Sequence, residues 1–498
     1  MGRSTVLANT EIPRSRNRLR YRARFVADRP NQSPVSSSKQ SNGEFHCSIR
    51  SGSNFPSTNR IGLEGCFARG GGLRSGDMRA IFAQKAIWVA ALGYFVDLYD
   101  LVLYGAVRME SLRGIGITGD AAFHVGASLL NYQMAGMVFG GFLFGALGDR
   151  IGRKSTLFGS IFIYSTATLL NAWVDDLPTY AALRFLAGCG LAGELGVAVT
   201  LANEVLPTHI RGMGSAWIAS IGFFGAACSS MISSKLPWRT AYGVGGLLGF
   251  MLLVARIRIL DPDLFLQAKK GASGASWGSL RLLFGSRARL ARLLPALLAG
   301  VPIWYVGGIL SYFAPEFGKA LGVKGDISAG TTIFCGYVGA MAGDIACGLL
   351  SQRWKSRKRA VLAFMILGGA LALGHPWFLT GADPWLFYGI QGWVGFGNGY
   401  FATLVAWVSE SFGTNLRVTA TSVIANLIRA SVIPLTLGFR ALIPSLGWVG
   451  ASVTVGAACF GAALWGALRM EDGFGKDLKY LEVDSKKDFS KENTSQSR

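Results

Sequence analysis

The sequence predicts an all-α integral membrane protein whose twelve transmembrane helices form two six-helix bundles. Of its 498 residues, 51% are hydrophobic and only 15% are charged, whereas soluble proteins carry about 25% charged residues. Twelve apolar segments follow one another, each close to the ~20 residues that a bilayer-spanning helix needs. A polar and basic break at residues 259–290 divides the twelve into two sets of six.

Short polar loops set the limits of the apolar segments and of the expected domains. The 67 glycines agree with membrane helices, because small residues let helices pack closely in lipid. The segments cover residues 82–107, 123–147, 154–174, 178–203, 212–232, 239–258, 292–315, 327–351, 360–380, 385–408, 418–440 and 445–468. The expected domains are a disordered basic N-terminal tail (1–78), a first bundle (79–258), a cytoplasmic linker (259–290), a second bundle (291–469) and a cytoplasmic C-terminal tail (470–498).

Lysine and arginine residues in the loops set the expected orientation. The net charge is +21, a balance that also occurs in nucleic-acid-binding proteins. Placing the N-terminus inside gives 18 basic residues to the inside loops and 7 to the outside connections. Since basic loops stay on the cytoplasmic side, we expect a multi-pass protein of the cell (inner) membrane with both termini in the cytoplasm. The expected partner of this charge is the lipid bilayer and not nucleic acid.

The basic segment at residues 13–25 allows three interpretations. It is rich in arginine and poor in acids, and no apolar stretch precedes the first span. A solvated tail or misplaced chain start, a contact with anionic lipid, and an organelle transit peptide all have this composition. The sequence favours the first interpretation, and it argues against a cleaved secretory signal.

The two halves of the chain repeat two short motifs at corresponding places. The motif GALGDRIGRK (145–154) follows the second span, and GLLSQRWKSRK (348–358) follows the eighth. EVLPTHIR (204–211) follows the fourth span and ESFGTNLR (410–417) follows the tenth, with Glu, Thr and Arg in the same spacing 206 residues apart. Two matches at the same relative positions indicate a duplicated six-helix unit.

These motifs carry a resemblance to a known family. GALGDRIGRK resembles the loop signature of the major facilitator superfamily. RFLAGCGLAGELGVAVTLANEVLPTHIRG (184–212) is similar to the fourth span and following loop of its sugar, metabolite–proton and phosphate–proton symporters. GYFVDLYDLVLYG (93–105) resembles the first span of the last two branches. The resemblance covers residues 80–470 and implies two bundles that rock about a central cavity, giving alternating access.

Charged residues and glycines at the inner ends of the spans are predicted to control this motion. Opposite charges at neighbouring helix ends can pair in one state and separate in another, as the resemblance also implies. Simple anchoring by positive charge is the alternative. Gln352 stands where the first-half motif has Asp149, so the charged contacts of the two halves are not expected to be equally strong. The predicted gating residues are Gly145, Asp149, Arg150, Gly152, Arg153, Lys154, Glu204, Arg211, Arg353, Arg357, Glu410 and Arg417.

Two acids inside the first span, Asp97 and Asp100, are the first candidates for proton coupling. They are three residues apart and share a helix face. A charge at the bilayer centre costs at least ~2.5–3.5 kcal/mol, so we expect them to face a wet cavity or a partner. Desolvation favours the neutral form of a carboxylate, which suits proton binding. Asp97 lies nearer the middle of the span and is the predicted main site, with Asp100 as an auxiliary.

The sequence alone leaves the role of these two acids open. A structural ion pair and a direct substrate contact are the alternatives to proton coupling. Glu194, deep in the fourth span, is a further coupling candidate, because the resembling symporters carry a carboxylate at the matching place. A hydrogen bond between packed helices is the alternative for Glu194.

Polar residues in three other spans are predicted to bind the substrate. Arg429 lies near the middle of the eleventh span, with Ser422 and Asn426 on the same helix face. Its guanidinium can hold a carboxylate or phosphate through two hydrogen bonds. It can equally neutralise Asp97 or Glu194 across the cavity, and the sequence does not decide between these roles. The predicted substrate-binding residues are Arg429, Asn426, Arg184, Gln391, Asn398 and Tyr400.

Motifs of soluble enzymes occur here in the wrong structural context. GCGLAG (188–193) matches a dinucleotide fingerprint but lies within a span, so close helix packing explains it better. GASWG (274–278) matches a nucleophile elbow but lies in the polar linker. The sequence has no GxxxxGKS or GxxxxGKT loop, its seven cysteines form no CxxC, and its four histidines are scattered. We therefore expect no enzyme, no metal site and no cofactor.

The predicted function is secondary active transport, as proton-coupled symport of a small polar or anionic metabolite by alternating access. The expected partners are a small-molecule substrate and protons, and the chain is expected to act as a monomer. Two alternatives remain open. One is a proton-independent exchanger or facilitator for a sugar or organic anion, and the other is a membrane sensor that does not transport.

Overall fold

The computed structural model describes residues 84–151, 153–194, 206, 211–259, 280–413 and 416–474. These residues form α-helices with one short 3₁₀ segment and one π-helical segment, and none of them lies in a β-strand. They all belong to one compact unit, Arg69–Arg498. The predicted N-terminal tail, Gly152, Glu204 and residues 475–498 lie outside the described residues.

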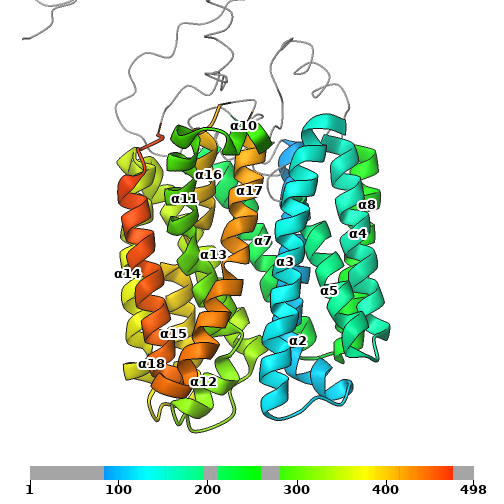
Figure 1. The fold of residues 1–498 in the computed structure, drawn as a ribbon, viewed down its shortest axis with the longest axis vertical. Coiled ribbons are helices and arrows are strands. Elements are labelled where there is room, and N and C mark those ends of the chain that lie inside the picture. Colours follow the sequence, from blue (N-terminus) through cyan, green and yellow to red (C-terminus); the bar gives the residue numbers. More distant parts are fainter. Residues whose placement is uncertain are drawn as a thin grey trace, which may run out of the picture. The chain divides into compact units, whose positions relative to one another are not determined.

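The six predicted spans of the first half each overlap a helix, and these helices pack into one bundle (Figure 1). Helix α2 lies against α7 and α8, α3 lies against α5, and α4 lies against α5 and α8. The helices are α2 (Lys85–Gly114), α3 (Asp120–Ile151), α4 (Arg153–Leu170), α5 (Leu177–Leu191), α7 (Arg211–Ser233) and α8 (Trp238–Ile259), with the 3₁₀ turn η1 (Asn171–Trp173) after α4.

The second half forms the other bundle, and several of its spans are interrupted. The seventh span is built from α11, η2 and α12, and the tenth from α15 and α16. Helix α18 contains the end of the eleventh span and the whole twelfth, which meet at Gly447 with a φ of 67°. The elements are α10 (Leu280–Phe284), α11 (Arg287–Tyr305), η2 (Val306–Ser311), α12 (Ala314–Ala320), α13 (Ala329–Trp354), α14 (Arg357–Leu379), α15 (Pro384–Gly397), α16 (Phe401–Glu410), α17 (Arg417–Ala430) and α18 (Val432–Arg469).

Local sequence signals explain where several helices begin. The side chain of Asp176 accepts a hydrogen bond of 2.9 Å from the Thr179 amide at the start of α5. Ser356 accepts one of 3.1 Å from the Arg359 amide at the start of α14. Such caps satisfy N–H groups that have no partner inside the helix. Among the described residues, seven helices are long and apolar enough to cross a membrane.

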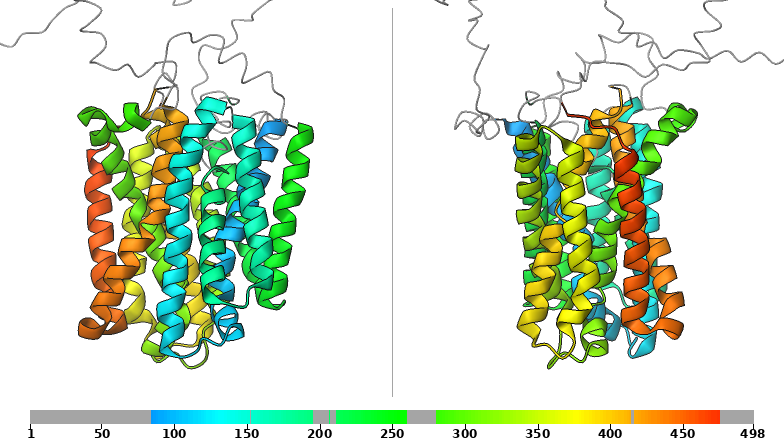
Figure 2. Two further views of the ribbon diagram at one scale, coloured as in Figure 1. Left: turned by 45° about the vertical axis from the view of Figure 1, so that its right-hand side comes forward. Right: turned by 90° about the vertical axis from the view of Figure 1, so that its left-hand side faces the viewer.

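The two bundles meet along two pairs of helices (Figure 2). Helix α7 of the first bundle lies against α13 of the second, and α3 lies against α17. We name the two ends of the molecule by their charged residues. The Arg108 end holds the C-terminal part of α2 and helix α12, and the Arg357 end holds the start of α14.

The glycine-rich segment at residues 188–193 is a helix-packing surface, which confirms the interpretation made from the sequence. A Cβ atom added to Gly188 would overlap the backbone oxygen of Gln133 on α3. A Cβ on Gly190 would lie 2.6 Å from the backbone nitrogen of Tyr164 on α4. Helix α5 can therefore lie against both neighbours only because these positions carry no side chain.

We expect Gly188→Ala to destabilise the protein, because the new methyl group collides with backbone that cannot rotate away. Overpacking of this kind costs about 1–3 kcal/mol. The matched control is Gly159→Ala on α4, where no atom lies within 4 Å of the added Cβ. Thermal unfolding in detergent should show a lower midpoint for the first variant and an unchanged or higher one for the second. Equal midpoints for the two variants would contradict the packing role.

Candidate central cavity and charge pairs

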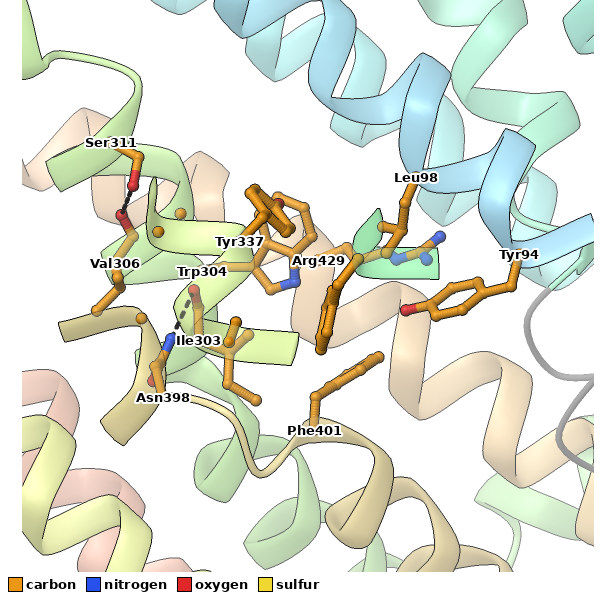
Figure 3. A pocket seen from close by; sticks show the side chains of 15 residues that line it. Tyr94, Leu98, Ile303, Trp304, Val306, Ser311, Tyr337, Asn398, Phe401 and Arg429 are labelled. Atoms are coloured by element: carbon orange, nitrogen blue, oxygen red, sulfur yellow. Dashed lines mark hydrogen bonds between the residues drawn. The ribbon is translucent and has the colours of Figure 1, made fainter. Parts of the chain in front are cut away.

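An apolar cavity lies between the two bundles, and five of the fifteen residues that line it are aromatic (Figure 3). The cavity volume open to the centres of water-sized spheres is about 50 Å³. This volume holds a few water molecules. Phe223 on α7 and Tyr337 on α13 close one side, with ring centroids 5.8 Å apart. The aromatic lining residues are Tyr94, Phe223, Trp304, Tyr337 and Phe401, and the polar ones include Ser311, Asn398 and Arg429.

A buried ion pair at this cavity joins the two bundles. Arg429 on α17 donates from Nη2 to Oδ2 of Asp97 on α2, at 2.7 Å. Asp97 is 0% exposed and Arg429 is 1% exposed. Tyr94, one turn before Asp97, points its hydroxyl toward the guanidinium (Figure 3). The sequence left the role of Arg429 open, and in this structure it neutralises Asp97.

This pair is not fully satisfied by hydrogen bonds. Among the described residues, Nε and Nη1 of Arg429 and Oδ1 of Asp97 have no hydrogen-bond partner. Removing one member of a buried pair leaves the other charge uncompensated, at a cost of about 3–5 kcal/mol. The guanidinium therefore needs an anion wherever it stays buried, and it has donors left over to bind one.

Asp100 belongs to a different environment from Asp97. It is fully buried and interacts electrostatically with Arg184 on α5, inside the first bundle. The Arg184 guanidinium lies 4.9 Å from the centre of the Tyr242 ring on α8. Of the two acids and their two arginines, only Arg429 lines the central cavity, and Asp97, Asp100 and Arg184 do not. Asp97 thus forms an ion pair with Arg429, whereas Asp100 and Arg184 interact without a hydrogen bond between them.

Glu194 is buried near the same interface. It is 0% exposed and interacts electrostatically with Asp97. Asn426, one turn before Arg429, donates 2.9 Å and 3.0 Å hydrogen bonds to the carbonyl oxygens of Ala192 and Ser422. Because Ala192 follows α5 and Asn426 lies on α17, this contact also joins the two bundles. Asn426 does not line the cavity.

The polar residues of the tenth span hold the interrupted helices in place. Gln391 donates to Ser311 Oγ at 2.8 Å, and Asn398 donates to the Ile303 carbonyl at 3.2 Å. Asn398 lines the cavity, whereas Gln391 does not. Both contacts connect the tenth span to the seventh.

The break between α15 and α16 is fixed from two sides. The Tyr400 hydroxyl, 0% exposed, donates to the carbonyl of Ala299 on α11 at 3.1 Å. The carboxylate of Asp344 on α13 accepts from the Ala402 amide, at 3.1 and 3.3 Å to its two oxygens. Asp344 therefore caps α16 by accepting from the Ala402 amide, one of the first N–H groups of the helix, which have no partner within it. This cap sets the position of Phe401, the first residue of α16, in the cavity wall.

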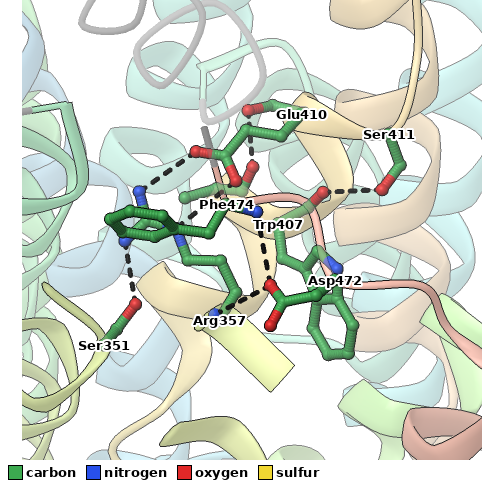
Figure 4. A network of polar contacts seen from close by, with 9 residues as sticks. Ser351, Arg357, Trp407, Glu410, Ser411, Asp472 and Phe474 are labelled. Carbon is green, nitrogen blue, oxygen red and sulfur yellow. Dashed lines mark hydrogen bonds and ion pairs between the residues drawn. The ribbon is translucent and has the colours of Figure 1, made fainter. Parts of the chain in front are cut away.

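At the Arg357 end, part of the predicted gating set forms one cluster (Figure 4). Arg357 donates to Glu410 through Nη2 at 3.0 Å and through Nε at 3.3 Å, which is bidentate geometry. Its Nη1 donates to Ser351 at 2.9 Å. Arg417 donates from Nε to the Ser409 carbonyl at 3.0 Å. Arg353 is exposed and contributes no hydrogen bond to this cluster among the described contacts.

The first residues of the predicted C-terminal tail complete this cluster. The sequence did not predict their contribution. Asp472 accepts from the Arg357 amide at 3.1 Å and is bonded to Ser356. The Phe474 ring lies 5.0 Å from the Arg357 guanidinium. The Trp407 indole donates to the Glu471 carbonyl at 2.7 Å. All these contacts stay within the second bundle.

The first-half gating residues can be placed only by their backbone. Gly145, Asp149 and Arg150 lie near the end of α3. Arg153 and Lys154 begin α4, and Arg211 begins α7. The side chains of these residues, and Gly152 and Glu204 altogether, lie outside the described part of the chain.

A second ion pair between the bundles, at the Arg108 end, was also missed. Arg108 on α2 donates from Nη2 to Oε1 of Glu316 on α12 at 2.7 Å. Each residue lies one position beyond the predicted end of the first span of its own half, which is residue 107 in the first half and residue 315 in the second. The sequence did carry a signal for this pair, because the two residues have opposite charges and occupy corresponding positions of the two repeats.

Two six-helix bundles facing each other across a central cavity are the architecture of a secondary membrane transporter. The sequence profile of the Major Facilitator Superfamily matches residues 90–436, and the chain belongs to this superfamily. It is a multi-pass membrane transporter for small molecules and not an enzyme.

Relatives and a solved structure agree with this assignment. A putative metabolite transport protein of Haemophilus influenzae is 29% identical over 363 residues, covering 70% of this chain and 86% of its own. A putative niacin/nicotinamide transporter of Bacillus subtilis is 26% identical, covering 73% and 90%. The proton:xylose symporter XylE shares the fold with a TM-score of 0.59 at 18% identity, covering 82% and 99%.

We expect Arg429→Gln and Asp97→Asn each to destabilise the protein more than the double variant does. Each single change leaves one buried charge unpaired, at about 3–5 kcal/mol, whereas the double change removes both charges. Thermal unfolding in detergent, arranged as a double-mutant cycle, measures this coupling.

The control for this cycle is the exposed pair of Lys324 and Asp383, 4.0 Å apart and 71% exposed on both sides. Exposed pairs contribute about 0–1 kcal/mol, so Lys324→Gln should leave the unfolding midpoint almost unchanged. Additive effects of the two buried substitutions would show that Asp97 and Arg429 do not depend on each other.

Proposed function

We propose that this protein is a proton-coupled symporter for a small organic anion in the cell (inner) membrane. The observation that carries the proposal is the Asp97–Arg429 pair, buried at the cavity and shared by the two bundles. The Arg357 end faces the cytoplasm, together with both termini, because the predicted inside loops carry most of the basic residues. The Arg108 end then faces outward. The chain acts as a monomer, because one chain contains both walls of the cavity.

Proton binding and anion binding are linked through this pair. When Asp97 takes a proton, its negative charge disappears and Arg429 loses its counter-ion. A carboxylate from solution can then replace it on the free donors of the guanidinium, so that the buried charge stays compensated. Proton and anion favour each other's binding by the same factor, as linkage requires. One proton and one monovalent anion thus travel together, and the net charge of the site is the same empty and loaded.

The cavity wall favours a flat, apolar body on this anion. Trp304, Tyr337 and Phe401 offer aromatic faces next to Arg429, and aromatic pairs add about 0.5–1.5 kcal/mol beyond the area they bury. The Bacillus subtilis relative is a putative niacin/nicotinamide transporter, and niacin combines a ring with a carboxylate. A small aromatic carboxylate is therefore the proposed substrate class, and nicotinate is the first probe.

The remaining predicted residues take supporting roles in this proposal. Asp100, paired electrostatically with Arg184, and Glu194 adjust the proton affinity of Asp97 from the first bundle. Asn398 contacts the substrate from the cavity wall. Gln391, Tyr400 and Asn426 position the helices that carry Phe401 and Arg429, through their hydrogen bonds to neighbouring helices.

We expect Asp97→Asn to abolish pH-driven accumulation and to keep exchange of external for internal substrate. The variant cannot exchange a proton at this position, and Arg429 stays available to the anion. Accumulation and counterflow of labelled nicotinate in proteoliposomes, with a panel of aromatic and aliphatic carboxylates in competition, measure the two activities.

Asp100→Asn is the matched comparison, since it neutralises the neighbouring acid, which interacts electrostatically with Arg184. It should shift the pH optimum and leave accumulation measurable. Accumulation that persists in Asp97→Asn would move the coupling role elsewhere, with Glu194 as the next candidate. Equal wild-type uptake with and without a pH gradient would identify a proton-independent exchanger, and binding without any flux would identify a sensor.

The cluster at the Arg357 end is proposed to control the rate of conformational exchange. Arg357→Ala removes the bidentate contact with Glu410 and loosens the junction of α13, α14 and α16. We expect slower transport with nearly unchanged equilibrium binding, because the cluster does not line the cavity. Arg359→Ala is the control, since Arg359 is exposed and lies in the first turn of the same helix, α14. A large loss of affinity at normal turnover would contradict the gating role.

A further inference from the structure

A second cleft lies on the surface of the first bundle, where the turn η1 meets the first turns of α8. Helices α4 and α8 lie side by side at the edge of this bundle (Figure 1). The cleft is open and has a volume of about 640 Å³, within the range of about 300–1,000 Å³ that is typical of ligand sites. Its lining includes Trp173, Asp175, Arg239, Gly243 and Leu247. The transport mechanism above does not use it.

We infer that this cleft binds the headgroup of a membrane phospholipid, and that its charges select phosphatidylethanolamine. The lipid phosphate binds Arg239, the ammonium group binds Asp175, and an acyl chain follows α8 into the membrane. The inference goes beyond the proposed transport function and does not depend on the substrate or on proton coupling. Only the assignment of the cleft to the outer leaflet rests on the proposed orientation.

The cleft lies at the level where a membrane protein meets lipid headgroups. Trp173, Trp377 and Trp385 are 66%, 71% and 83% exposed, and each lies near the Arg108 end of a span. Exposed tryptophans are enriched at the interface between membrane and water. Trp173 lines the cleft itself. The charged pair beside Trp173 is therefore at headgroup depth.

Two opposite charges are held side by side in this cleft. Nη2 of Arg239 donates to Oδ1 of Asp175 at 2.7 Å, and Nη1 donates to the Ala172 carbonyl at 3.0 Å. The guanidinium also lies 4.3 Å from the centre of the Trp238 ring. An exposed ion pair of this kind contributes little to stability. Because the side chains of Arg239 and Asp175 are 39% and 84% exposed, a ligand can reach both charges.

The ethanolamine headgroup complements this pair, because it carries one negative and one positive group. Its phosphate accepts charge-assisted hydrogen bonds from a guanidinium, and its primary ammonium has three N–H donors, as a lysine does. Choline carries the same charges but has no N–H to donate to Asp175. Phosphatidylglycerol has no cationic group, and its phosphate is repelled by Asp175 and by Asp176 next to it. The expected affinity therefore falls from phosphatidylethanolamine through phosphatidylcholine to phosphatidylglycerol.

An apolar stripe on α8 continues from the cleft along the membrane-spanning part of the helix. Leu247, Met251 and Val254 are exposed and recur every three or four residues, so they share one helix face. Beneath this stripe α8 is closed against α4, because a Cβ added to Gly246 would come within 2.8 Å of the Leu169 Cα atom. An acyl chain therefore lies over the stripe and does not enter the bundle.

Gly243 allows the cleft to be blocked without disturbing the fold. It lies inside α8, and no atom is within 4 Å of an added Cβ. Leucine is a much better helix former than glycine, and its side chain at this position fills part of the cleft. The matched control is Gly461→Leu on α18, where the glycine is also exposed and also has no atom within 4 Å of an added Cβ.

The test counts the lipids that the detergent-solubilised protein retains in native mass spectrometry. Dioleoyl phosphatidylethanolamine, phosphatidylcholine and phosphatidylglycerol are added in equal amounts. The wild-type protein and Gly461→Leu should retain one phosphatidylethanolamine, with an affinity about tenfold or more above that for phosphatidylglycerol, the effect of one charge-assisted hydrogen bond. Gly243→Leu and Arg239→Gln should lose this lipid while their thermal unfolding midpoints stay close to that of the wild type.

Two further measurements separate headgroup recognition from general contact with lipid. Asp175→Asn should still bind lipid through Arg239 but lose the preference for phosphatidylethanolamine over phosphatidylglycerol. Glycerophosphoethanolamine, which has the same headgroup without acyl chains, should not displace the lipid at equal concentration. Phosphatidylethanolamine retained by Gly243→Leu, an unchanged preference in Asp175→Asn, or equal competition by the chain-free headgroup would overturn the inference. A wild-type dimer that Gly243→Leu abolishes would also overturn it, because a second copy of the chain would then cover the cleft.

Discussion

The structure depends on one electrostatic constraint: an arginine buried at the centre of a membrane protein must keep an anion beside it. Arg429 meets this requirement through Asp97, 332 residues away in the chain and in the other bundle. The guanidinium stays charged at any physiological pH, so the carboxylate is the member of the pair whose charge can change. When Asp97 loses its charge, Arg429 has no counter-ion, and another anion is needed to compensate the buried guanidinium. In the proposed mechanism, the proton site and the anion site therefore coincide, and charge balance at this one place couples the binding of the proton to the binding of the anion.

Three largely buried ion pairs, one at each end and one at the centre of the molecule, have different consequences for movement. Asp97–Arg429 and Arg108–Glu316 cross between the bundles, so they must change when the bundles move. Arg357–Glu410 lies within the second bundle and is covered by residues of the C-terminal segment, so it can persist through the same movement. In the proposed alternating access, the ion pair within the second bundle keeps the helix ends together at the Arg357 end, and the ion pair between the bundles separates at the Arg108 end.

The sequence predicts the fold well because hydropathy alone sets the length of a membrane helix. It also identifies Asp97 and Arg429 as important, because a charge inside an apolar span needs a compensating group. It cannot tell which partner each charge takes, since that depends on how the bundles pack. Asp97 and Asp100 share a helix face, yet Asp97 forms an ion pair with Arg429 and Asp100 interacts electrostatically with Arg184. Arg108 and Glu316 were missed because charges just beyond a span look like ordinary solvated loop residues, and their burial comes from tertiary structure.

The central claim is that a bound anion replaces the charge of Asp97 on Arg429. The most direct measurement is the number of protons taken up when nicotinate binds to the detergent-solubilised protein, from calorimetry in buffers of different ionisation enthalpy. The account predicts uptake of close to one proton per bound anion in the wild-type protein at a pH where Asp97 is charged, and none in Asp97→Asn. Binding of nicotinate to the wild-type protein with no proton uptake at any pH would contradict it.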